Sequence, residues 1–218
     1  MTTRAIVAMA FVWVLVDPAA GYAQRAPAPV SRRGVRGFFD AGTVWVSSAE
    51  SFEAVTGRAS TTTLGGGVQI TNIWRGVFVQ ADLARATMSG ERLFVHEGQR
   101  FALDIPVHIT MMPFDVTVGY RFVLGRGRVI PYAGAGLGIF AYREESPFAA
   151  PGDDVDERFR SWHVAGGVEV PIMRWLSAGA ELRYRAVPDA LGNGGISEVL
   201  NESDAGGTAV RVRIAVGR

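Results

Sequence analysis

The sequence of 218 residues contains no cysteine and no lysine. The absence of cysteine excludes disulfides, thiolate metal sites and cysteine nucleophiles. All 22 basic residues are arginine, which we interpret as codon usage in a GC-rich genome, and they almost balance 21 acidic residues. A formal net charge of +1 gives no strong electrostatic attraction to nucleic acid. No apolar run after residue 23 reaches eighteen residues, which excludes membrane-spanning helices.

The amino terminus has the pattern of a cleaved secretory signal. Arg4 supplies a positive charge, residues 5–16 form an apolar run of twelve, and Pro18 follows that run. Gly21 and Ala23 are small residues that suit the −3 and −1 positions of a cleavage site. Twelve apolar residues are too few to span a bilayer as a helix. We therefore expect residues 1–23 to be a signal peptide.

Two consecutive segments, 162–172 and 176–186, alternate strictly between two faces. In the second segment Leu182 lies on an apolar face, whereas Glu181 and Arg183 lie on a charged one. Alternation of this length predicts a β-hairpin whose two faces meet different solvents. A soluble sandwich would point its apolar face inward and leave its charged face in water. The concentration of charge on one face instead favours a barrel with apolar side chains toward lipid and polar side chains toward the lumen.

The same alternation recurs along the chain and predicts an all-β protein, an eight-stranded antiparallel up-and-down transmembrane β-barrel. Long polar connections at 47–59, 144–158 and 188–204 alternate with short turns between other strand pairs. The predicted strands cover 35–46, 60–72, 77–94, 103–122, 129–143, 162–172, 176–186 and 208–217.

The fourth predicted strand changes the parity of its apolar residues. Ile109 and Met111 occupy odd positions, whereas Phe114 and Val116 occupy even ones. A slip of one residue reverses every side chain unless a bulge intervenes, and proline is tolerated at a bulge. We therefore expect one long strand with a bulge at Pro113, in preference to two short strands with a turn there.

The lumen of an eight-stranded barrel is just wide enough to be filled by side chains. Isolated charges inside it would be costly, so we expect carboxylates to pair with arginines and to leave no wide water channel. The expected lumen charge network consists of Asp82, Arg121, His163, Glu169, Glu181, Arg183, Arg185, Arg211 and Arg213. The aromatic residues expected at the membrane interfaces are Trp74, Trp175, Tyr142 and Trp162.

Catalytic and metal sites are weakly indicated. His163 could act as a base on Ser161, but the two are only two residues apart and no glycine elbow surrounds the serine. The acidic run 153–157 does not have the spacing of a calcium-binding loop. We expect no catalytic residue, no metal and no cofactor.

Two segments carry a resemblance to a known family: VIPYAGAGLG at 129–138 and GAELRYR at 179–185. Together with the signal peptide, they resemble the small eight-stranded outer-membrane β-barrels of bacteria, the OmpA-like and OmpW-like barrel domains. The resemblance covers about residues 35–218. It implies the barrel fold, the bacterial outer membrane as location, and a periplasmic leader at 24–34.

The expected function is a non-enzymatic one, with a structural or surface-presenting role. We expect a monomer whose partner is outer-membrane lipid, with no nucleic acid bound and with the long loops making any contact outside the cell. Two alternatives stay open. One is a narrow channel for small solutes, and the other is a secreted lipocalin-like carrier, which needs apolar side chains inside and polar ones outside.

Overall fold

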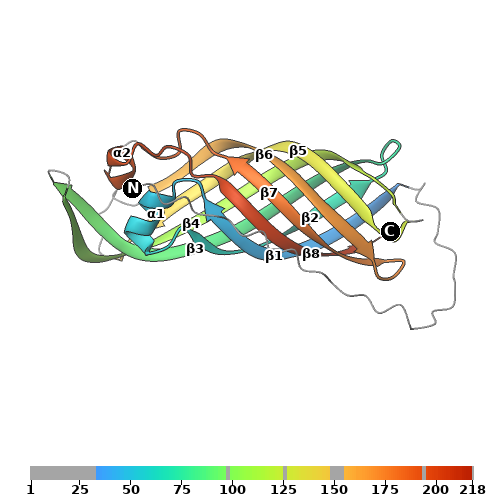
Figure 1. Ribbon diagram of the computed structural model, residues 1–218, viewed down its shortest axis with the longest axis horizontal. Coiled ribbons are helices and arrows are strands. Elements are labelled where there is room, and N and C mark those ends of the chain that lie inside the picture. Colours follow the sequence, from blue (N-terminus) through green and yellow to red (C-terminus); the bar gives the residue numbers. More distant parts are fainter. Residues whose placement is uncertain (1–32, 97–98, 125–126, 148–154, 193–194, 218) are drawn as a thin grey trace, which may run out of the picture.

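A closed antiparallel barrel with two short helices makes up the described structure, a computed structural model that covers residues 33–96, 99–124, 127–147, 155–192 and 195–217 (Figure 1). Each strand pairs with its neighbours in sequence, and β1 closes the barrel by pairing with β8. The predicted eight-stranded up-and-down barrel is therefore confirmed. The predicted signal peptide and nearly all of the predicted leader lie outside the described residues. The strands are β1 Gly34–Val46, β2 Ser60–Thr71, β3 Val77–His96, β4 Gln99–Arg121, β5 Ile130–Glu145, β6 Val155–Pro171, β7 Leu176–Ala186 and β8 Gly207–Gly217.

Two of the predicted loops contain helices. Helix α1 (Ala49–Thr56) lies within 47–59, and α2 (Gly195–Val199) lies within 188–204. Gly57 ends α1 in the left-handed conformation, with φ of 72°. The predicted loop 144–158 is shorter than expected, because β5 and β6 extend into it from both sides. Neither described helix has the length and apolar character needed to cross a membrane.

The two ends of the barrel differ. At one end, which we call the turn end, short connections join β2 to β3, β4 to β5 and β6 to β7. The other end, the loop end, carries α1, α2 and the extended β3–β4 hairpin, whose strands have 20 and 23 residues (Figure 1). In the described part of the chain, the helices and the extended hairpin therefore all project from one end.

Side-chain directions in β7 and β8 follow the predicted orientation. Leu182 and Val212 are 50% and 64% exposed on the outer surface, whereas Arg183 and Arg211 are 2% and 3% exposed. The secreted-carrier alternative needed the opposite arrangement and is wrong at this level of the barrel.

The predicted bulge at Pro113 is wrong. Met112 pairs with Ala141 and Pro113 with Phe140 in one continuous register between β4 and β5. The register shift of the β3–β4 hairpin lies between Glu91 and Leu93 instead. Odd-numbered residues of β4 point inward on both sides of Pro113, as the burial of Met111 and Asp115 shows. The change of apolar parity thus needs another cause.

That cause is an inversion of polarity along the barrel axis. In β3 the inward residues change from Asp82 to Ala86 and Met88, while the outward residues change from Leu83 to Thr87. We call the row of paired outward residues Leu83, Phe114 and Ile139 the crossover level. From the turn end up to this level the barrel is apolar outside and charged inside. Beyond it, toward the loop end, β3, β4 and β5 are polar outside and apolar inside, like strands of a water-soluble domain.

An apolar cap closes the lumen at the loop end. Phe52 of α1, which is 4% exposed, packs there with inward side chains of the strands. The carboxylate of Glu202 accepts hydrogen bonds from the backbone N–H groups of Glu50 at 3.3 Å and Ser51 at 2.8 Å. An acidic group in this position stabilises the first turn of a helix, so the β7–β8 connection holds α1 over the barrel. The apolar cap consists of Val46, Phe52, Ala86, Met88, Ile109, Met111, Phe140, Tyr142, Val187, Ala190 and Ala205.

Candidate functional site in the barrel lumen

Glu181 on β7 lies at the centre of the charged lumen. Its Oε1 accepts hydrogen bonds from Nε of Arg183 at 3.1 Å and Nη2 of Arg211 at 2.7 Å. Its Oε2 lies 3.0 Å from Nη2 of Arg213 and accepts a hydrogen bond from the Tyr132 hydroxyl at 3.0 Å. Three guanidinium groups thus share one carboxylate that is 2% exposed. This convergence compensates a charge that would be very costly to bury alone.

Two aspartates complete the central tier, one on β1 next to β8 and one on β3 across the barrel from β7. Asp40 on β1 accepts hydrogen bonds from Nη1 of Arg211 and Nη2 of Arg213, both at 3.1 Å. Asp82 on β3 accepts one from Nη1 of Arg183 at 2.9 Å. These pairs join β7 and β8 to β1 and β3 through the interior, so the lumen is cross-linked as well as filled.

A second tier lies nearer the turn end, around Glu169 on β6. Arg121 donates through Nη1 to Glu169 Oε2 at 2.9 Å and to Gln69 Oε1 at 3.0 Å. Arg36 also binds both of these residues. The amide nitrogen of Gln69 donates to Gln80 Oε1 at 3.2 Å, which connects this tier to the central one.

The third tier, nearest the apolar cap, contains a buried histidine. His163 Nε2 lies 2.9 Å from the Thr117 hydroxyl, and His163 Nδ1 lies 3.5 Å from Asp115 Oδ1. A hydroxyl, an imidazole and a carboxylate in this order have the order of a catalytic relay. However, Thr117, His163 and Asp115 are 2%, 1% and 0% exposed, so a substrate has no access to them. Ser161, the candidate nucleophile from the sequence, has no hydrogen bond to His163.

Glycines in β5 make room for these large side chains. A Cβ on Gly136 would lie 2.0 Å from the Val116 carbonyl oxygen and 2.6 Å from His163 Cε1. A Cβ on Gly138 would lie 2.3 Å from Asp115 Oδ1. The alternating glycines of VIPYAGAGLG thus allow β5 to approach β4 and the third tier closely.

All nine lumen residues expected from the sequence lie inside the barrel and take part in its hydrogen bonds and ion pairs, Arg185 through Asp115 of the third tier. Sequence reasoning missed Arg36, Asp40 and Asp115 as members. We use the name lumen network for the charged set Arg36, Asp40, Asp82, Asp115, Arg121, Glu169, Glu181, Arg183, Arg185, Arg211 and Arg213.

Three of the four expected interface aromatics lie on the outer surface. Trp74 and Trp175 are 67% and 49% exposed near the turn end, and Trp162 is 45% exposed and packs edge-on against Tyr184 at 5.8 Å. Tyr142 is the exception. It is 7% exposed and belongs to the apolar cap, because even-numbered residues of β5 point inward and it lies beyond the crossover level.

Metal binding has no support in the described part of the chain, where no three His, Asp or Glu side chains form a group that could hold an ion. Residues 153 and 154 of the acidic run lie outside this part. Asp156, near the start of β6, forms an ion pair with Arg143 at 2.6 Å.

A closed barrel of eight strands, with an apolar outer surface and an ion-paired lumen, defines the class of bacterial outer-membrane β-barrels. The chain belongs to the outer membrane protein beta-barrel domain family, whose model matches residues 14–212. It is a protein of the bacterial outer membrane.

Solved structures of outer-membrane proteins share this fold. Neisserial surface protein A (NspA) is 12% identical, with a TM-score of 0.53 over 84% of this chain and 96% of that one. A major outer membrane protein from Thermus thermophilus is 13% identical, with a TM-score of 0.50 over 84% of this chain and 99% of that one. No curated protein sequence matches. At these identities the likeness shows the fold alone.

Proposed function

We propose that this protein is a non-enzymatic, monomeric outer-membrane barrel that presents its loop end at the cell surface and conducts no solutes through its lumen. The observation that carries this proposal is the lumen network, in which Arg183, Arg211 and Arg213 converge on Glu181 and occupy the middle of the barrel. A barrel whose lumen is cross-linked in this way acts as a rigid support for the structures at its ends.

Two barriers in series support the absence of conduction. The lumen network fills the barrel from the turn end to the crossover level, and the apolar cap, with Phe52 and Met88 buried in it, closes the loop end. An ion would have to break buried ion pairs and then cross an apolar layer, and each step is costly.

The loop end carries the features suited to contact outside the cell. In outer-membrane barrels short turns face the periplasm and long connections face outward. We therefore propose that α1, α2 and the extended β3–β4 hairpin lie outside the cell. We propose, consistently, that residues 1–23 are removed on export and that 24–34 form the periplasmic leader.

Planar-bilayer recording tests the closed lumen. The purified protein should show no stable open state under voltage. The matched comparison is the double variant Phe52→Ala/Glu181→Ala, which removes part of the apolar cap and the centre of the lumen network. Heat-modifiable mobility on gels shows whether this variant still folds as a barrel. If it does, the variant should conduct measurably. A large, persistent conductance of the unaltered protein would refute the closed lumen.

Epitope accessibility on whole cells tests the orientation. An epitope inserted after Arg58, which is exposed at the loop end, should bind antibody on intact cells. The matched epitope after Arg174, in the β6–β7 turn, should bind only after the outer membrane is opened. Labelling of the Arg174 epitope alone on intact cells would reverse the proposed orientation.

A further inference from the structure

The exposed charges of the turn end are all positive in the described part of the chain. Each short connection there contains an exposed arginine, and another precedes β1, which begins at the same end: Arg75, Arg128, Arg174 and Arg33. Among the described residues, no carboxylate lies in these connections and none of the four arginines has an ion-pair partner. The loop end differs, since Glu53, Glu145 and Asp156 are exposed there.

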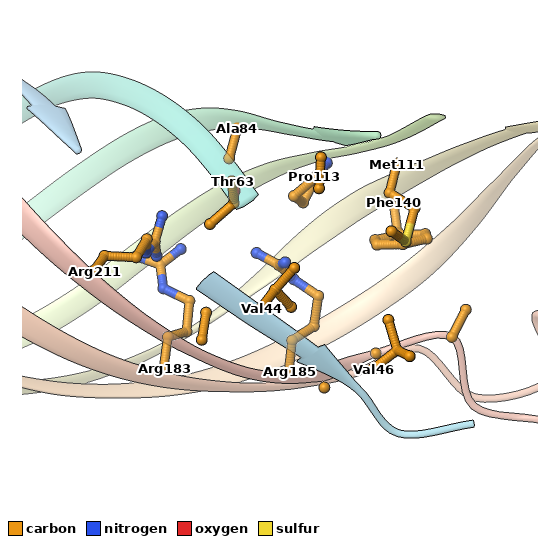
Figure 2. A pocket seen from close by; sticks show the side chains of 15 residues that line it. Val44, Val46, Thr63, Ala84, Met111, Pro113, Phe140, Arg183, Arg185 and Arg211 are labelled. Carbon is orange, nitrogen blue, oxygen red and sulfur yellow. The ribbon is translucent and has the colours of Figure 1, made fainter. Parts of the chain in front are cut away.

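The lumen adds positive charge at the turn end. In the second tier, Arg36 and Arg121 share one carboxylate, that of Glu169. Deeper in the barrel the described charges balance, because four arginines pair with four carboxylates. Figure 2 shows three of these deeper arginines around a cavity of about 40 Å³: Arg183, Arg185 and Arg211. The surplus positive charge of the lumen network therefore lies nearest the turn end.

The turn-end arginines adjoin exposed aromatic side chains. Arg75 follows Trp74, which is 67% exposed, and the guanidinium carbon of Arg75 lies 5.6 Å from the centre of the indole ring. Arg174 precedes Trp175, which is 49% exposed. Tryptophan side chains at the edge of an apolar barrel surface lie at the level of the lipid headgroups. The neighbouring guanidinium groups are therefore held at the depth of the lipid phosphates.

We propose that the turn end binds anionic phospholipids, whose phosphate groups contact Arg75, Arg128 and Arg174. A guanidinium group stays charged and matches a phosphate with two parallel hydrogen bonds. A zwitterionic headgroup also carries a phosphate, but its own cation opposes the positive field of the turn end, so lipids of net negative charge are preferred. The assignment of these lipids to the periplasmic leaflet rests on the proposed orientation of the barrel, whereas the preference for them does not.

Quenching of tryptophan fluorescence by brominated lipid tests this preference. Trp74 and Trp175 alone report on the turn end when Trp13, Trp45 and Trp162 are replaced by phenylalanine. The protein is refolded into vesicles that contain brominated phosphatidylglycerol with plain phosphatidylcholine, and into vesicles with the bromine on the other lipid. Phosphatidylglycerol should bind beside the two tryptophans about fivefold more strongly, the effect of one arginine near an anionic headgroup. High salt should reduce this preference, because exposed charges are screened.

Two sets of arginine substitutions locate the preference. The triple variant Arg75→Gln/Arg128→Gln/Arg174→Gln should bind the two lipids about equally. The matched control, Arg58→Gln/Arg85→Gln/Arg158→Gln, removes three exposed arginines beyond the crossover level and should keep the preference. Heat-modifiable mobility on gels shows that both variants fold as barrels.

Equal binding of the two lipids beside Trp74 and Trp175 in the protein with all its arginines would overturn the proposal. An undiminished preference in the turn-end triple variant would overturn it as well. Neither result depends on which way the barrel faces. A reversed orientation in the epitope experiment would move the lipids to the outer leaflet and leave the preference unchanged, so the two proposals fail separately.

Discussion

Glu181 illustrates how a residue can be buried with its charge and still stabilise the barrel. Its carboxylate has partners on three arginines and on Tyr132, so its removal leaves several cations without a counter-charge. Breaking a buried ion pair from one side costs more than the pair itself contributes, because the remaining charges keep their desolvation penalty.

We predict that Glu181→Gln lowers the free energy of unfolding by about 3–5 kcal/mol. Denaturant titration of the protein refolded into lipid vesicles measures this change. Glu145→Gln is the matched control, because Glu145 is 56% exposed in its ion pair with Arg143, and its loss should leave the free energy of unfolding nearly unchanged. Equal effects of the two substitutions would show that Glu181 is not central to the network.

Gly136 gives a second prediction for a single residue. An added methyl group meets the carbonyl oxygen of Val116 at 2.0 Å, so Gly136→Ala should force the backbone apart and cost about 1–3 kcal/mol. Gly37→Ala, whose nearest contact would be at 4.0 Å, should be neutral or slightly stabilising. The same vesicle titration distinguishes them, and a neutral Gly136→Ala would contradict the close packing of β5 on β4.

The sequence predicted most of the lumen network because an isolated charge stands out in an alternating apolar strand. Asp115 has the same parity as Arg121, and Arg36 the same parity as Asp40, so the signal for the missed members was present in the alternation. The individual ion pairs could not be predicted, since Arg183 and Asp82 are 101 residues apart and meet only through the strand register and the closure of the barrel.

At the scale of elements, α1 depends on tertiary contacts. Eight residues are too few for a stable isolated helix, so the burial of Phe52 and the cap supplied by Glu202 decide its formation. This explains why the segment reads as a polar loop in the sequence. The helix forms because Phe52 packs against the apolar side chains at the loop end of the barrel.

We predict that Phe52→Ala releases α1 without unfolding the barrel. Hydrogen exchange followed by mass spectrometry should show faster exchange of residues 49–56, while β7 and β8 keep their protection. Glu53→Ala, an exposed change in the same helix, should leave exchange nearly unchanged. Unaltered exchange of α1 in Phe52→Ala would show that the apolar cap does not hold the helix.

The incorrect prediction of a bulge at Pro113 in β4 has a general physical basis. The prediction of a bulge treats a change of apolar parity as a change in side-chain direction, because it assumes that each face of a strand meets one environment. In this barrel the environment changes along the strand instead, because Met111 and Asp115 point inward on opposite sides of the crossover level. Alternation predicts which residues share a face, but it does not tell whether that face meets lipid, water or the interior.

At the scale of the whole molecule, the barrel changes polarity along its axis, as β3, β4 and β5 show. The membrane covers the part with an apolar exterior, and water surrounds the part beyond the crossover level. The absence of cysteine allows single-cysteine variants to probe this division without background. Val212 and Thr87 are both exposed on the outer surface, on the two sides of the crossover level, so they differ in environment and not in burial.

Spin-label accessibility in lipid vesicles tests this division most directly. A nitroxide on Val212→Cys should relax rapidly with oxygen, which concentrates in lipid, and be protected from a water-soluble nickel complex. A nitroxide on Thr87→Cys should show the reverse. Equal access of the nickel complex to both positions would contradict the inversion of polarity on which the account of this barrel depends.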